Sequence, residues 1–280
     1  MKNNNTIKTL KLYNFKNIND LSEVFKYNTS INKLIIYSAY LNSCMNNINT
    51  FINSLINNKT LKYLSINKNK ITTNDYNNKQ LSINDINIIN NLLQYNTTLK
   101  TLKLCNCNLF TYNDALISLK NNTTLTTLDL SNNHINNIKN ISESLLSNTS
   151  LTKLDLSSNE IEDINYLSTV LKQNTNLQKL YLQNNKLNIT NEFIESLKNN
   201  TTLYKLSYEI KDEEDFNALC NSLKYNNYLS NLSIYAQSYN DDIIDKNEVK
   251  PILNNLLDYN NKLVDIQFYS IENEYDYFCC

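Results

Sequence analysis

Glycine, tryptophan and arginine are absent from the 280-residue sequence, which contains one proline and one histidine. Without glycine the chain cannot form the glycine-rich turns that hold dinucleotides or phosphates, the turn of a serine nucleophile elbow, or an EF-hand calcium loop. The histidine, His134, falls in a turn where we expect it to be exposed, and no second histidine is left for a zinc site. We therefore expect a protein that is not an enzyme, with no catalytic residue, cofactor or metal.

Charge and the chain ends limit the partners to be expected. A formal net charge of −1 provides no overall field that would steer the protein to nucleic acid, so we expect no nucleic acid partner. No continuous apolar stretch opens the sequence, which predicts a cytoplasmic protein with reduced cysteines and no membrane association. The terminal pair Cys279 and Cys280 resembles the prenylation signal of Rab-type GTPases. That modification needs a GTPase body, which is absent here, so lipidation stays a minor alternative.

An internal repeat organises the sequence. Four segments, starting at Leu99, Leu125, Leu151 and Leu177, fit the pattern LxxLxLxx[N/C]x[L/I] at a constant interval of 26 residues. This pattern resembles the leucine-rich repeat family. Ten copies cover nearly all of residues 1–280, which predicts a single domain with longer connections near 72–84 and 236–249. The other copies start at Ile7, Ile31, Leu61, Leu203, Leu229 and Leu263.

The residues between the leucine motifs indicate the subclass. Apolar residues stand ten and six positions before each later repeat start, as Ile141 and Leu145 do before Leu151, and this spacing places them on one helix face. The alternation of Leu128 and Leu130 is typical of a strand. The unit resembles the ribonuclease-inhibitor-like subclass, which implies an α/β solenoid. In such a horseshoe, parallel strands line the concave face and helices form the convex face.

Asparagine makes up 58 of the 280 residues, and two series of it keep register with the repeat. One series lies three residues before every repeat start, and we predict that most of its members from Asn28 onward adopt positive φ, as glycine usually does after a helix. Codon bias in an AT-rich genome is the alternative. In the family that the sequence resembles, the second series forms a hydrogen-bonded ladder, with Cys107 as a substitute here. The first series is Asn4, Asn28, Asn58, Asn96, Asn122, Asn148, Asn174, Asn200, Asn226 and Asn260, and the second is Asn69, Asn133, Asn159 and Asn185.

Three positions of each strand, the third, fifth and seventh of the motif, should project onto the concave face. Tyrosines gather there near both ends of the solenoid, which indicates partner binding or reflects codon bias. Lysines at the third position of three successive strands are either balanced by Asp129 and Asp155 or available to an acidic partner. The candidate partner-binding residues are Tyr13, Tyr37, Tyr63, Lys153, Lys179, Tyr181, Lys205, Tyr235 and Tyr269.

These features predict a protein-protein interaction module, expected to be monomeric, that binds a macromolecular partner on its concave face. A regulator of a GTPase, similar to leucine-rich-repeat GTPase-activating proteins, and a substrate adaptor are the alternatives. The acidic run from Asp212 to Asp215 suits the N-terminus of a helix rather than a metal site.

Overall fold

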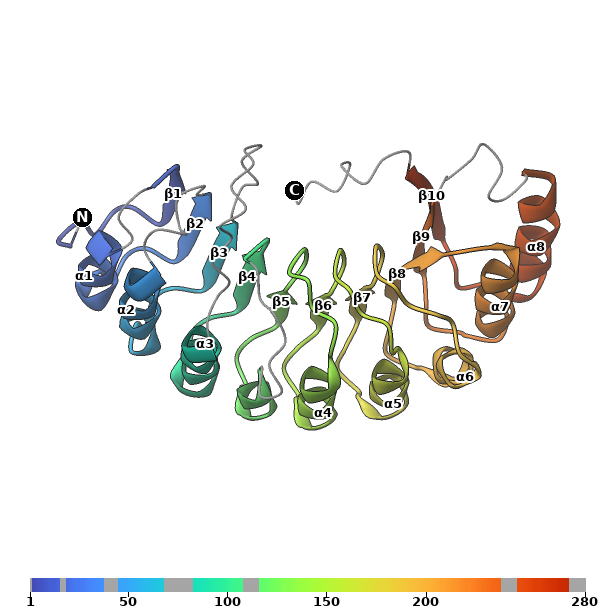
Figure 1. Cartoon of the computed structure of the whole chain (residues 1–280), viewed down its shortest axis with the longest axis horizontal. Coiled ribbons are helices and arrows are strands. Elements are labelled where there is room, and N and C mark those ends of the chain that lie inside the picture. The colour runs from blue at the N-terminus through green and yellow to red at the C-terminus, as the bar shows by residue number, and fades with distance from the viewer. Residues whose placement is uncertain are drawn as a thin grey trace.

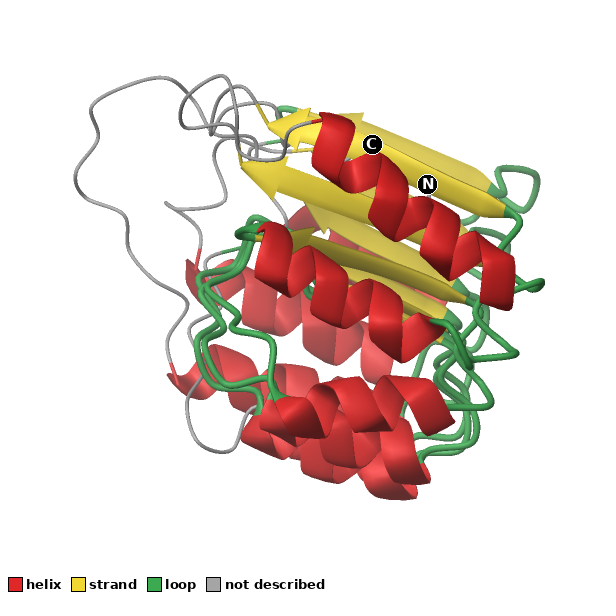
Figure 2. Ribbon diagram, turned by 90° about the vertical axis from the view of Figure 1, so that its right-hand side faces the viewer, coloured by secondary structure: helices red, strands yellow, loops and turns green. Residues whose placement is uncertain are grey.

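The computed structural model describes residues 2–15, 19–37, 45–67, 83–107, 116–237 and 246–271. Most of the two longer connections, together with Asn69, Cys279 and Cys280, lies outside the described residues. Within these ranges, ten parallel strands form one sheet in the order of the sequence, and helices follow the outer side of its arc (Figures 1 and 2). The structure is therefore the expected α/β horseshoe.

Strands and helices alternate along the chain. The strands are β1 (Thr9–Tyr13), β2 (Lys33–Tyr37), β3 (Tyr63–Asn67), β4 (Thr101–Cys105), β5 (Thr127–Asp129), β6 (Lys153–Asp155), β7 (Lys179–Tyr181), β8 (Lys205–Ile210), β9 (Asn231–Gln237) and β10 (Asp265–Ile271). The helices are α1 (Asn19–Tyr27), α2 (Met45–Ile56), α3 (Ile83–Tyr95), the 3₁₀-helix η2 (Ile117–Asn121), α4 (Lys139–Ser147), α5 (Asn165–Gln173), α6 (Asn191–Asn199), α7 (Glu213–Leu223) and α8 (Lys246–Tyr259).

The register of the sheet places equivalent repeat positions side by side. Leu128 of β5 aligns with Leu154 of β6, which in turn aligns with Leu180 of β7, and all three side chains are fully buried. On the helices, Ile141 and Leu145 are also buried. One continuous core between sheet and helices results, so each repeat is stabilised by its neighbours rather than by its own contacts.

The first asparagine series does not adopt the conformation predicted for it. None of its members is among the described residues with positive φ, and Asn148, for example, has φ −77° and ψ 127°. The left-handed conformation instead occurs directly after the strand motif, at Asn106, Asn132 and Asn184 among others. The prediction was wrong because it assumed that this position is selected for backbone freedom, whereas the structure uses the side chain.

Both ends of the carboxamide are used at this position, as Asn148 illustrates. Its Oδ1 accepts hydrogen bonds from the backbone amides of Ser150 (3.0 Å) and Leu151 (2.8 Å), at the start of the next strand segment. Its Nδ2 donates to the carbonyl oxygens of Leu119 (2.7 Å) and Asn122 (2.8 Å) in the preceding repeat. Glycine has no group that could make these bonds. All ten members accept the equivalent pair of amides.

The second series forms the expected ladder on the other side of the strands. Asn159 Oδ1 accepts the backbone amides of Asn133 and Ile135, both at 3.0 Å, and its Nδ2 donates to the carbonyl oxygen of Leu130 at 3.1 Å. Cys107 replaces an asparagine, and its thiol lies 3.5 Å from the carbonyl oxygen of Ile66. Two asparagine ladders therefore hold adjacent repeats together, one before the strands of all ten repeats and one after β5, β6 and β7.

Candidate functional site

The concave face is built from three rows of side chains. Because equivalent positions are register partners on neighbouring strands, the third, fifth and seventh motif residues of adjacent repeats lie next to one another, and strand alternation directs them to the face opposite the helices. All nine candidate partner-binding residues lie in these rows. They come from β1 (Tyr13), β2 (Tyr37), β3 (Tyr63), β6 (Lys153), β7 (Lys179 and Tyr181), β8 (Lys205), β9 (Tyr235) and β10 (Tyr269).

The end tyrosines form stacked pairs. Tyr13 and Tyr37 are register partners on adjacent strands, with ring centroids 5.1 Å apart and ring planes 10° from parallel. Tyr235 and Tyr269 repeat the arrangement at the other end, at 4.6 Å and 16°. These spacings are typical of stacked aromatic pairs. The seventh-position tyrosines therefore present two preformed aromatic surfaces, which are separated by the polar middle of the sheet.

The lysine row lies against aromatic rings. Lys153 Nζ is 4.4 Å from the ring centroid of Tyr181, and Lys205 Nζ approaches the same ring at 5.8 Å. Lys179 Nζ is 5.3 Å from the ring of Tyr204. Tyr204 precedes β8 and was not predicted, because its motif position lies outside the alternation that identifies concave residues. Burial first, and then the charge of Asp155, raise the pKa of Tyr181, so its hydroxyl stays protonated at neutral pH.

Asp129 and Asp155 do not pair directly with this row. Asp129 forms its ion pair with Lys103, at 3.2 Å, on the side away from the three lysines. Within the described ranges, no carboxylate lies within 4.0 Å of the ammonium groups of Lys153, Lys179 or Lys205. The two aspartates therefore form no ion pair with the row, although the charge of Lys153 acts to lower the pKa of Asp155 against the larger effect of burial. The tyrosine rings are the close neighbours of the row.

The two aspartates occupy adjacent strands and have opposite pKa shifts. Burial alone would raise the pKa of Asp129, but hydrogen bonds from Ser131 and the charge of Lys103 together lower it. The pKa of Asp155 is raised, mainly by burial and then by the neighbouring Asp129 charge, although Ser157 donates to its Oδ1. The middle of the concave face therefore has an acidic site beside the lysine row.

Other residues singled out in the sequence have structural contacts. His134 is exposed, and its Nδ1 lies 2.7 Å from Glu160 Oε1, so it links the turns of two adjacent repeats. The hydrogen bonds from His134 and Lys186 lower the pKa of Glu160. Asp212 Oδ1 accepts from the amide of Asp215 at 2.8 Å and caps α7, as predicted for the acidic run. Across the described residues no group of three His, Cys, Asp or Glu side chains could hold a metal ion, and no helix is long and apolar enough to cross a membrane.

Comparison with known proteins agrees with this architecture. A family model described as a leucine rich repeat matches residues 57–74, 121–138 and 147–164. No curated protein matches the sequence. The family model thus matches leucine-rich repeats in three segments, and the aligned strands with their alternating helices extend the same strand-and-helix unit over the rest of the described residues.

Several solved structures are similar. Actin-binding site 2 of leiomodin-1 is 25% identical over 52% of this chain and 90% of that chain, with a TM-score of 0.43. Internalin C2 of Listeria monocytogenes is 20% identical over 72% of this chain and 71% of that chain, with a TM-score of 0.46. An internalin F from the same bacterium is 21% identical over 92% of this chain and 58% of that chain, with a TM-score of 0.47.

Proposed function

We propose that this protein is a non-enzymatic interaction module that binds an acidic protein partner across Lys153, Lys179, Lys205 and the C-terminal tyrosine pair. The observation that carries the proposal is the row of three lysines on adjacent strands with no ion pair among the described residues. Like charges directly opposite each other on neighbouring strands are destabilising. A partner carboxylate would offset this repulsion and form charge-assisted hydrogen bonds.

The tyrosines beside the row suit the same partner. Tyr181 holds Lys153 and Lys205 over its ring, so the ammonium groups are kept at the surface of the sheet. Tyr235 and Tyr269 add a stacked aromatic surface on β9 and β10, next to the lysine of β8. Aromatic side chains bury a large area and keep a polar group, which makes them favoured anchors in protein interfaces. We infer that the partner has acidic residues followed by an apolar segment.

Regulation of a GTPase and service as a substrate adaptor are narrower versions of this role, and no contact in the described residues favours either one. A GTPase regulator of this sequence could not supply an arginine finger, since the chain has no arginine. Measurement of GTP hydrolysis by captured GTPases, with and without the protein, separates that activity from plain binding.

The proposal is tested by charge reversal. Affinity capture from the cells that produce the protein, followed by titration of the captured partner, compares the wild type with the triple variant Lys153→Glu, Lys179→Glu, Lys205→Glu. A matched control reverses three exposed lysines of the outer helices, so that both variants change the net charge equally. The control residues are Lys120, Lys139 and Lys198.

Each reversal on the concave face should cost about 0.5–1 kcal/mol, so the triple variant should bind about ten- to a hundredfold more weakly. The loss should shrink at high salt, because exposed charges are screened. The control should keep the wild-type affinity. Equal affinity of wild type and concave triple variant would refute the proposal.

A further inference from the structure

The loops after β5, β6 and β7 are joined by a regular pattern of carboxamide contacts. A ladder asparagine accepts a hydrogen bond from the backbone amide 24 residues earlier and donates one to the carbonyl oxygen 29 residues earlier. Asn159 also accepts the amide 26 residues earlier. The side of each loop that faces the next repeat thus offers backbone amides as donors and one carbonyl oxygen as an acceptor. A carboxamide can bind both, because it carries an acceptor oxygen and a donor nitrogen.

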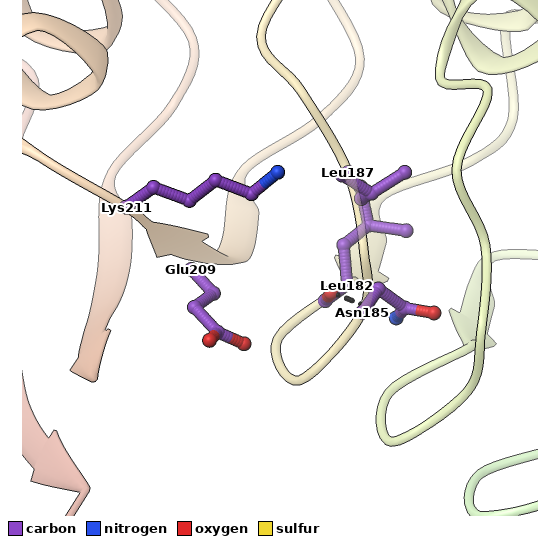
Figure 3. A pocket seen from close by; sticks show the side chains of 5 residues that line it. All are labelled: Leu182, Asn185, Leu187, Glu209 and Lys211. Atoms are coloured by element: carbon purple, nitrogen blue, oxygen red, sulfur yellow. Dashed lines mark hydrogen bonds between the residues drawn. The ribbon is translucent and has the colours of Figure 1, made fainter. Parts of the chain in front are cut away.

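The pattern ends at Lys211, which occupies the ladder position of the eighth repeat. The same three intervals counted back from Lys211 lead to Leu187, Asn185 and Leu182. These three residues, with Glu209 and Lys211, line a cavity of about 120 Å³, which we call the terminal notch (Figure 3). A cavity needs only about 10–15 Å³ of such volume to hold a water molecule, so the notch has room for a small side chain.

Lys211 does not replace the asparagine. Its side chain is exposed, and its Nζ donates to Asn188 Oδ1 at the rim rather than to the backbone of the loop. A lysine also has no acceptor with which to bind an amide hydrogen. Within the described part of the chain, the backbone amides of Asn185 and Leu187 have no hydrogen-bond partner, although Leu187 is only 4% exposed. A buried amide without a partner is costly, and a ligand acceptor would remove that cost.

Glu209 contributes a hydrogen-bond acceptor to the notch. In the preceding repeats, Asn132 and Ser158 donate their backbone amides to a carbonyl oxygen of the next loop. The equivalent amide of Asn184 instead donates to Glu209 Oε2 at 2.5 Å. The carboxylate is therefore held beside the notch, where it offers an acceptor to a ligand with hydrogen-bond donors, while Lys211 adds a positive charge to the same lining.

We propose that the terminal notch binds a primary carboxamide, the side chain of an asparagine or glutamine in a peptide partner. The ligand oxygen accepts the amide of Leu187, and the ligand nitrogen donates to the carbonyl oxygen of Leu182, as the ladder asparagines do in the preceding repeats. A carboxylate lacks the donor, and an ammonium group lacks the acceptor. Of these three groups, only the carboxamide supplies both a donor and an acceptor in one plane.

The test uses ¹⁵N-labelled full-length protein and three small probes: acetamide, N,N-dimethylacetamide, which has no donor, and acetate. Acetamide should produce saturable shifts at the amides of Leu187 and Asn185, at least about fivefold stronger in apparent affinity than those of the other two probes. Absence of a saturable shift at Leu187, or equal binding of acetate, would overturn the proposal.

A substitution tests the same contact from the protein side. Lys211→Asn should place a carboxamide in the notch, abolish the acetamide response and slow hydrogen exchange of the Leu187 amide. Lys198→Asn, on the exposed side of α6, is the matched control and should leave the response unchanged. An unchanged acetamide response in folded Lys211→Asn also counts against the proposal. If that variant does not fold, the probe series on the wild-type protein decides whether the proposal holds. The concave triple variant should still bind acetamide, so the two proposals fail independently.

Discussion

Replacement of Asn148 by glycine tests how the first asparagine series stabilises the fold. Asn148 is 2% exposed, and its side chain makes four hydrogen bonds to backbone groups. Loss of each bond costs about 0.5–1.5 kcal/mol, or about 2–6 kcal/mol in all, and unsatisfied buried groups move the value toward the upper end. Glycine adds an entropic cost of about 0.5–1 kcal/mol, because φ is −77° and the position needs no special freedom.

Asn132→Gly is the matched control, because the same substitution is made at a residue with φ 59°. Glycine adopts this conformation without a steric penalty, so the change should alter the free energy of unfolding by no more than about 1 kcal/mol. Urea unfolding followed by circular dichroism measures both variants. A further readout is hydrogen exchange of the Leu151 amide, which should become faster in Asn148→Gly only. Equal stability of the two variants would refute the assignment of the carboxamide as the stabilising group.

Two further predictions concern buried polar groups. Tyr208 is fully buried, and its hydroxyl has no hydrogen-bond partner among the described residues. Tyr208→Phe should therefore raise the free energy of unfolding, measured by urea titration, by about 1–3 kcal/mol. A loss of stability would show that the hydroxyl forms a hydrogen bond. Asp155 has a raised pKa in the folded state, so its contribution to stability is lost as pH rises through that pKa. Asp155→Asn keeps the acceptor for Ser157 and should therefore have a higher free energy of unfolding than wild type at pH 7. This gain in stability should disappear below the ordinary pKa of 3.8. A gain that persists at low pH would contradict the role of the Asp155 charge.

Most of the fold could be predicted from periodicity, because strand and helix spacing are local properties of the backbone. The 26-residue interval located the strands, and the buried positions of Leu128, Ile141 and Leu145 followed from alternation and i,i+4 spacing. The concave rows were predictable for the same reason, since one residue in two on a strand points away from the helices. The ladder role of Asn159 followed from the family resemblance.

What remained undetermined by the sequence depends on distances between repeats. The carboxamide of Asn148 bonds to Leu119, 29 residues earlier, and no local pattern shows that this carbonyl oxygen lies within reach. The ring of Tyr204 beside Lys179 is another contact between adjacent repeats that motif position did not indicate.

The sequence by itself therefore determined the repeat, its strand and helix, and the residues that face the concave side, because these depend on periods of two and about four residues. Only the tertiary structure decided what the polar side chains contact. Stacking brings residues 24 to 41 positions apart within hydrogen-bond distance, which gives the first asparagine series its partners and leaves the terminal notch where Lys211 interrupts the ladder.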